Sequence, residues 1–392
     1  MKKISFQLLF VIIVVIFTFS CDKKVVDSVV QPQKNDILVD KDATQKTVNL
    51  FNSLQYYSTQ GIMVGQQDPF TGRHSTEGGD EMSDMKLTCG KHPLVVGLDF
   101  LFVTNVNNTP GSWYAEQEEL LISQAKMAYR KGLVVTYTWH FNNPYTRDWF
   151  YVESDPERIE IAKKSMKSLV PGGENNAYYK SVLAKIASVM KQIKGDDGEI
   201  VPCFFRPFHE FEGSWFWWGA AYCTPEEFKA VYQFTVEYMR DELDLHNVLY
   251  AYSPDKNLTT EAQYLERYPG DDYVDLIGMD NYGDFVSNNI SAAAEKLKMV
   301  SDYALAHNKL AALTECGFGD EPKPTYLYTR TFLAALKMYD LQLAYMMFWS
   351  NSADTYYVPT PNKNTSKDFI SFANDEYTLL EGDVSDLYGT RE

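Results

Sequence analysis

The sequence lacks the cysteine and histidine spacings that usually hold metal ions. Its four cysteines beyond residue 40 form no CxxC or mixed Cys/His pattern, and no H-x-H or H-x-x-x-H occurs among the six histidines. A hydrolase that activates water on a bound metal ion is an alternative, but the sequence lacks the ligand spacing such enzymes usually have. We therefore expect neither a metal ion nor a cofactor. A disulfide is possible in an exported protein, and free buried thiols are the alternative; the sequence does not decide between them for Cys89, Cys203, Cys223 and Cys316.

Positive charge is also scarce. The chain has 36 Lys and Arg residues against 53 Asp and Glu residues, for a formal net charge of −17. Such a balance argues against nucleic acid or an anionic surface as a partner. A neutral ligand would not be repelled.

One strongly apolar run, Ile4 to Phe17, is short for the roughly 20 residues of a membrane span. Two lysines precede it and Cys21 follows it, so we expect residues 1–21 to be a lipoprotein signal peptide ending at a lipidated Cys21, with a membrane anchor as the alternative. Residues 22–40 are expected to be a flexible tether and 41–392 a single domain. The stretch CDKKVVD lacks the acidic run that resembles a surface-export signal in Bacteroides-like bacteria, which favours the periplasmic side.

Apolar runs alternate with segments of helical periodicity along the rest of the chain. Eight such runs occur, at residues 61–67, 92–100, 132–140, 199–210, 247–254, 274–283, 309–319 and 343–351. Eight strands with intervening helices predict an α/β fold, the (β/α)8 TIM barrel, as one domain. A doubly wound open sheet is the alternative, but its usual Gly-rich phosphate turn is missing after the first run, which continues GQQDPFTG.

Polar or aromatic residues follow almost every predicted strand, and in a barrel these ends meet at one face. The tryptophans all fall at or just after a predicted strand end; they are Trp113, Trp139, Trp149, Trp215, Trp217, Trp218 and Trp349. Aromatic faces among hydrogen-bonding groups suit sugars, so the pattern predicts a groove for a polysaccharide. The alternative is that the rings only cap the barrel mouth.

Two carboxylates stand out by position, Glu210 at the end of the fourth run and Glu315 near the end of the seventh. Glycoside cleavage needs a protonated acid at the leaving oxygen and a second carboxylate at the anomeric carbon. The tryptophans after Glu210 favour its protonated form, while Arg206 and Tyr282 would hold Glu315 ionised. For either carboxylate alone, a structural salt bridge is the alternative.

The stretch RPFHEFEGSWFWWG, residues 206–219, resembles the acid/base motif of the family 26 glycoside hydrolases, which are mainly β-mannanases. LTECGFG, residues 313–319, resembles their nucleophile strand. Together with VDLIGMDNYG, residues 274–283, and the order of the strands, the similarity runs from about Gly61 to Trp349.

The resemblance implies Glu210 as general acid/base and Glu315 as nucleophile of a retaining double displacement. It further implies that His209 binds the sugar at the cleavage point and that Tyr282 hydrogen bonds the nucleophile. The other implied residues line subsites or support Glu315; they are His140, Trp149, Trp215, Trp349 and Arg206. We also expect Trp217 and Trp218 to bind the polymer. Glu212 departs from the Asn or Asp usual in the motif and leaves two readings open, an altered leaving-side subsite or a raised pKa of Glu210.

The expected function is a retaining β-1,4-mannanase acting on mannan or galactomannan, either within chains or by releasing mannobiose from their ends. An endo-xylanase or mixed-linkage β-glucanase on the same barrel is the alternative. A non-catalytic glycan-binding lipoprotein is the alternative of another class, but it has no need for Glu at both strand ends. We expect a monomer whose membrane contact is the lipid on Cys21.

Overall fold

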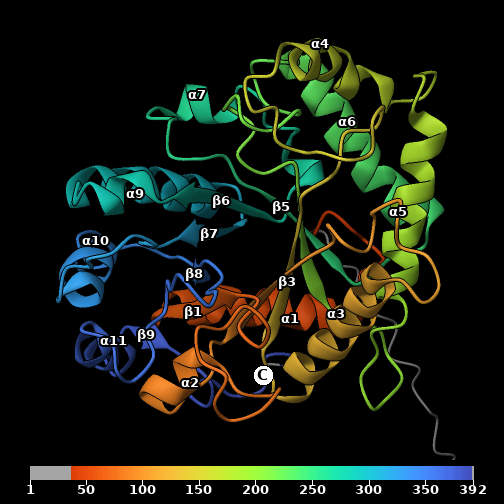
Figure 1. Ribbon diagram of the computed structural model, residues 1–392. Helices are drawn as coiled ribbons and strands as arrows, with labels where there is room; N and C mark the ends of the chain where they lie inside the picture. The colour runs from red at the N-terminus through yellow and green to blue at the C-terminus, as the bar shows by residue number, and fades with distance from the viewer. Residues whose placement is uncertain (1–36, 391–392) are drawn as a thin grey trace, which may run out of the picture. The chain divides into compact units, whose positions relative to one another are not determined.

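Eight parallel strands close into a barrel in this computed structural model, which describes residues 37–390. Each strand pairs with its neighbour along the chain, and β1 pairs with both β2 and β8, which closes the ring (Figure 1). The strands are β1 (Ile62–Gln67), β2 (Val95–Asp99), β3 (Val134–Trp139), β4 (Cys203–Pro207), β5 (Val248–Tyr252), β6 (Leu276–Asn281), β7 (Leu310–Cys316) and β8 (Tyr345–Phe348). Each lies inside one of the eight predicted runs, so the predicted TIM barrel is confirmed.

A ninth strand, β9 (Thr378–Leu379), pairs parallel with β1 outside the ring. The sequence analysis missed it because so short a segment carries no periodic signal.

Helices fill the connections between the strands. The α-helices are α1 (Gln45–Ser58), α2 (Asp84–Cys89), α3 (Trp113–Arg130), α4 (Pro156–Ser165), α5 (Asn176–Met190), α6 (Pro225–Glu237), α7 (Glu261–Leu265), α8 (Gly283–Val286), α9 (Ile290–Ala306), α10 (Ala334–Leu336) and α11 (Ser366–Ala373). Short 3-10 turns are η1 (Met166–Ser168) and η3 (Asp271–Tyr273), and π-helical turns are η2 (Tyr238–Glu242) and η4 (Tyr328–Leu333). Helix α6 begins with a capping box formed by Thr224 and Glu227, with Pro225 at the first turn.

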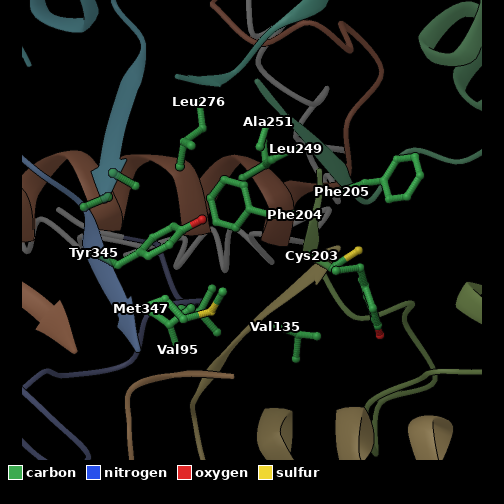
Figure 2. Close-up of a cluster of buried hydrophobic side chains, with 14 of the residues drawn as sticks. Val95, Val135, Cys203, Phe204, Phe205, Leu249, Ala251, Leu276, Tyr345 and Met347 are labelled. Atoms are coloured by element: carbon green, nitrogen blue, oxygen red, sulfur yellow. The ribbon is translucent and has the colours of Figure 1, made fainter. Parts of the chain in front are cut away.

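Successive residues of β4 face opposite sides of the barrel wall. The ring of Phe204 lies 6.1 Å from that of Tyr345 although β4 and β8 are not neighbours, so both rings lie inside the barrel (Figure 2). Phe205 points the other way, and its ring lies 6.1 Å from that of Trp139. This alternation also turns Arg206, two residues after Phe204, toward the interior.

The segment before α1 belongs to the barrel domain. Leu38, Val39 and Asp40 are buried, and the backbone N–H of Val39 donates to Asp275 Oδ1 at 2.9 Å. The expected tether to residue 40 is therefore wrong for its last residues, because apolar side chains and a buried acceptor hold them in place. The expected signal peptide, the lipidated Cys21 and the rest of the tether lie outside the described residues.

Within residues 37–390, no helix is long and apolar enough to span a membrane. Cys89, Cys203, Cys223 and Cys316 are all free thiols, so the disulfide left open by the sequence does not form among them.

Because Phe204 fills the barrel interior with no exposed surface, we expect Phe204→Ala to lower the free energy of unfolding by about 3–5 kcal/mol. Leu305→Ala removes a side chain of α9 that is 47% exposed, and should change it by less than about 0.5 kcal/mol. Urea denaturation of both variants checks this; equal losses would contradict an interior position for Phe204.

Candidate active site

A buried arginine joins the carboxylates at the C-terminal ends of the strands. Arg206 has no exposed surface, and its Nη1 donates to Asp280 Oδ2 at 2.8 Å and to Ser253 Oγ at 3.0 Å. Its Nη2 donates to Glu315 Oε1. Burial alone would lower the pKa of the guanidinium, but Asp280 and Glu315 raise it above its usual range, so Arg206 is a permanent cation here.

A register shift between β6 and β7 brings two adjacent β7 residues, Thr314 and Glu315, to the buried Arg206–Asp280 pair. The pairing shifts between Met279 and Asp280, so that Asp280 pairs with Glu315. Thr314 Oγ1 donates to Asp280 Oδ1 at 2.6 Å, while Glu315 receives Arg206. Such irregularities often redirect side chains beside active sites.

Glu315 is held from two sides. Besides the contact with Arg206, its Oε2 accepts the hydroxyl hydrogen bond of Tyr282 at 2.9 Å. Only 4% of the residue is exposed. The resemblance implied both Arg206 and Tyr282 as partners of Glu315. A positive charge and a hydroxyl donor both stabilise the negative charge of a carboxylate, which suits Glu315 to act as a nucleophile.

Glu210 follows β4 in a left-handed backbone conformation, with φ at 50°, which is uncommon for a residue other than glycine. Its N–H donates to the carbonyl of Ser253 at 2.9 Å, and its Oε2 accepts from Trp215 Nε1 at 2.8 Å. Burial, followed by the charges of Asp280 and Glu315, raises the pKa of Glu210 well above its usual range. The side chain therefore stays protonated where an exposed Glu would be ionised.

One oxygen from each of Glu210, Asp280 and Glu315 lies within 4.8 Å of the others. Three carboxylates so close could hold a cation, but Arg206 already supplies positive charge to two of them. The arrangement provides one protonated and one arginine-bound carboxylate, the pair that glycoside cleavage with retention needs at about 5 Å.

The two predicted histidines lie together beside this pair. The rings of His140 and His209 are 4.7 Å apart and nearly perpendicular. Burial, then Arg206 and His140, hold the pKa of His209 well below its usual value, so His209 is neutral. Its Nδ1 is buried without a hydrogen-bond partner in the described part of the chain. His140 Nδ1 forms a hydrogen bond with Asp99 Oδ2 at 2.5 Å.

The predicted aromatic residues divide into a partly exposed set at the barrel mouth and a set with little or no exposed surface. Trp215, Tyr282 and Trp349 are partly exposed at the mouth, and the Trp349 ring lies 6.1 Å from that of His140. Trp149 is only 9% exposed and its ring is covered by the guanidinium of Arg158 at 5.2 Å. Trp149 therefore offers little surface to a sugar.

The prediction that Trp217 and Trp218 bind polymer is wrong. Both are fully buried; Trp217 Nε1 donates to the carbonyl of Phe141 at 2.6 Å and Trp218 Nε1 to that of His209 at 2.8 Å. Arg206 supports Glu315, as the resemblance implied, and touches no substrate, because the guanidinium has no exposed surface.

Sequence reasoning missed three groups with a part in the site. Asp280 and Ser253 hold Arg206, and Tyr151, 43% exposed, stacks on Phe216 at 5.1 Å. Burial, then the charge of Glu210, raises the pKa of Tyr151, which places this ring in the field of the acid/base. Asp280 and Ser253 stand at predicted strand ends, a signal that could have found them, whereas Tyr151 lies in a long connection with no such signal.

Glu212, which departs from the usual motif, contacts the backbone of a neighbouring connection. Glu212 Oε2 accepts the backbone N–H of Asp255 at 3.0 Å, so the side chain binds the connection after β5. Burial raises the pKa of Glu212 to about 7, and the nearby Asp255 adds to the shift. The largest charges that raise the pKa of Glu210 are those of Asp280, Glu315 and Asp255.

This burial predicts a pH-dependent stability. The unfolded chain releases the Glu212 proton near the usual 4.5, but the folded protein keeps it to about 7, so stability is lost between these values as pH rises. Glu212→Gln keeps an acceptor for Asp255 without the charge. We expect it to exceed the wild type by up to ~3 kcal/mol near pH 8 and to match it near pH 4.

Urea denaturation at both pH values measures this difference. Glu266→Gln, at an exposed carboxyl, is the matched control and should follow the wild type at both. A Glu212→Gln variant with the same offset at both pH values would contradict the buried acid.

Comparison with known proteins agrees with this geometry. Residues 39–383 match the model of glycosyl hydrolase family 26. A mannan endo-1,4-beta-mannosidase of Bifidobacterium adolescentis is 33% identical over 367 residues, covering 87% of this chain and 35% of that protein. One from Bacillus subtilis is 25% identical over 88% of each chain. Endoglucanase H of Acetivibrio thermocellus is 26% identical over 40% of this chain and 15% of its own length.

Solved structures agree as well. A family 26 protein from Muricauda sp. has 40% identity and a TM-score of 0.87 over 90% of this chain and 96% of its own. A family 26 β-mannanase from Bacteroides ovatus has 31% identity and a TM-score of 0.79 over 88% of this chain and 98% of its own. The chain spans about a third of the Bifidobacterium relative but nearly all of these two domains. On the match across the barrel, the chain belongs to glycosyl hydrolase family 26 and is a glycoside hydrolase.

Proposed function

We propose that this glycoside hydrolase cleaves β-1,4-mannan or galactomannan with retention of anomeric configuration. The observation that carries the proposal is the Glu210–Glu315 pair, with oxygens within 4.8 Å and opposite surroundings. The sugar specificity rests on the relatives named mannan endo-1,4-beta-mannosidase.

In the first step, Glu210 gives its proton to the glycosidic oxygen while a Glu315 oxygen bonds to the anomeric carbon. The bond between that carbon and the leaving oxygen breaks, and the leaving sugar departs with a hydroxyl. Arg206 and Tyr282 position the Glu315 carboxylate for this attack. The glycosyl ester links the sugar to Glu315.

In the second step, Glu210, now ionised, takes a proton from water. The water oxygen bonds to the anomeric carbon and Glu315 leaves, so two inversions give net retention. Neutral His209 and the open faces of Trp215 and Trp349 are available to bind sugars around the cleaved bond.

A β-glucanase is the second candidate, because one partial relative is an endoglucanase. Xylan hydrolysis remains the further alternative on the same barrel. A protein that only binds glycan has no need for two carboxylates at this spacing, so the Glu210–Glu315 pair argues against that alternative. The lipid anchor stays a prediction because Cys21 falls outside residues 37–390. Export, location on the periplasmic side and the monomeric state also stay predictions.

The first test is product formation from unsubstituted β-1,4-mannan and galactomannan, with xylan and mixed-linkage β-glucan as controls. We expect oligosaccharides from mannan at a rate well above that from either control polymer. Rapid viscosity loss with mixed products indicates cleavage within chains, and mannobiose from the outset with slow viscosity loss indicates action at chain ends. Faster release from β-glucan or xylan would reject mannan specificity.

The second test concerns the two carboxylates. Glu210→Ala and Glu315→Ala should each lower kcat on mannan by about 10²–10⁴-fold or more, since each removes one catalytic group. Glu210→Ala should retain more activity on an aryl mannoside, whose leaving group needs no proton. NMR of the first product should show the β-anomer; an α-anomer would contradict retention. The Leu305→Ala variant serves as the control for expression and folding.

A further inference from the structure

A carboxylate outside the catalytic pair fixes the orientation of His140. Asp99 ends β2, and its Oδ2 is 2.5 Å from His140 Nδ1. Its Oδ1 accepts the backbone N–H of His140 at 3.2 Å and that of Leu101 at 2.8 Å. Both oxygens are therefore engaged, and two of the three contacts go to one histidine. Neither the sequence nor the family comparison assigns a role to Asp99.

The opposite ring nitrogen is what His140 can offer to a substrate. Nδ1 is committed to Asp99, whereas Nε2 has no hydrogen-bond partner anywhere in residues 37–390. The ring lies 4.7 Å from that of His209 and 6.1 Å from that of the partly exposed Trp349. His140 thus lies among the side chains that surround the carboxylate pair.

The charges around the ring decide whether Nε2 donates or accepts. Burial alone would lower the pKa of His140, but Asp99 and, more weakly, Glu315 raise it, against the opposing charge of Arg206. The cation carries N–H on both nitrogens, whereas a neutral ring bonded through Nδ1–H would leave Nε2 as an acceptor. The neighbouring His209 is neutral and adds no charge.

Asp68, in the turn after β1, is a further charged neighbour of His140. Burial, then the charge of Asp99, raises the pKa of Asp68 to about 7, and His140 opposes that shift. Asp68 and Asp99 line one pocket of about 250 Å³ between that turn and α3. Below about pH 7, Asp68 is neutral, so Asp99 is the ionised partner of His140.

We propose that Asp99 is a positioning residue for the hydrolysis proposed above, holding His140 as a hydrogen-bond donor through Nε2–H to the sugar beside Glu315. Asp99 touches no substrate itself and acts through the imidazole. The proposal rests on the proposed function for its activity readout, whereas the protonation of His140 is measurable without any substrate.

Asp99→Asn tests the proposal because it keeps the shape of the side chain and removes its charge. We expect kcat/KM on a mannan oligosaccharide near pH 7 to fall by about 10–100-fold, the usual effect of losing one charge-assisted hydrogen bond. The loss should shrink as pH falls toward about 5, because His140 with its lowered pKa is protonated again. A loss that is constant across pH would overturn the proposal.

Coupling between the two residues gives a second readout. If Asp99 acts through His140, Asp99→Asn should have little further effect in a His140→Ala background. Equal fold-losses in both backgrounds would overturn the proposal. The chain offers a matched control in a second Asp–His pair outside the site. Asp271, the first residue of η3, has its Oδ2 2.7 Å from Nδ1 of His307. Asp271→Asn should leave kcat/KM unchanged at every pH.

NMR titration of the histidine rings separates this proposal from the proposed function, and it needs only the wild type should Asp99→Asn fail to fold. His140, assigned by comparison with His140→Ala, should carry N–H on both nitrogens at about pH 6.5 and titrate above the usual histidine value. Titration below that value would overturn the proposal even if mannan is cleaved. If the expected titration is found without mannan hydrolysis, the proposed substrate fails and the Asp99–His140 pairing stands.

Discussion

The contact on which the site depends is the buried arginine between two acids. Arg206 can be a cation without exposed surface only because Asp280 and Glu315 face it, and each acid lies on a different strand. Removing one partner from such a group leaves an uncompensated buried charge. Arg206 therefore links β4, β6 and β7 at the mouth of the barrel, and through Ser253 it also reaches the end of β5.

The same group makes two chemically identical side chains different. Glu315 receives the arginine and the tyrosine hydroxyl, which stabilise a negative charge. Within residues 37–390, the Glu210 carboxyl accepts only the indole N–H of Trp215, and the nearby acids raise its pKa further. A carboxylic acid and a carboxylate can thus face one glycosidic bond at the same pH, which the double displacement requires.

The sequence predicted the parts of the structure that depend on periodicity. Strands buried on both faces read as apolar runs, so the eight strands and the positions of Glu210 and Glu315 at their ends could be placed. What it could not predict is which way a loop residue points. Trp217 and Trp218 stand beside the acid/base in the chain but turn into the protein, and Asp99 is recognisable as a partner of His140 only once β2 and β3 are in register.

The two buried tryptophans explain why the charged motif is so rich in aromatic residues. Phe208 and Glu210 both have positive φ, a conformation that only a rigid surrounding sustains. The Trp218 indole donates to the carbonyl between them, and its ring stacks on that of Phe216 at 4.4 Å. In this segment the aromatic packing fixes the backbone that aims the acid, while the partly exposed Trp215 alone among the three tryptophans contacts the catalytic carboxyl.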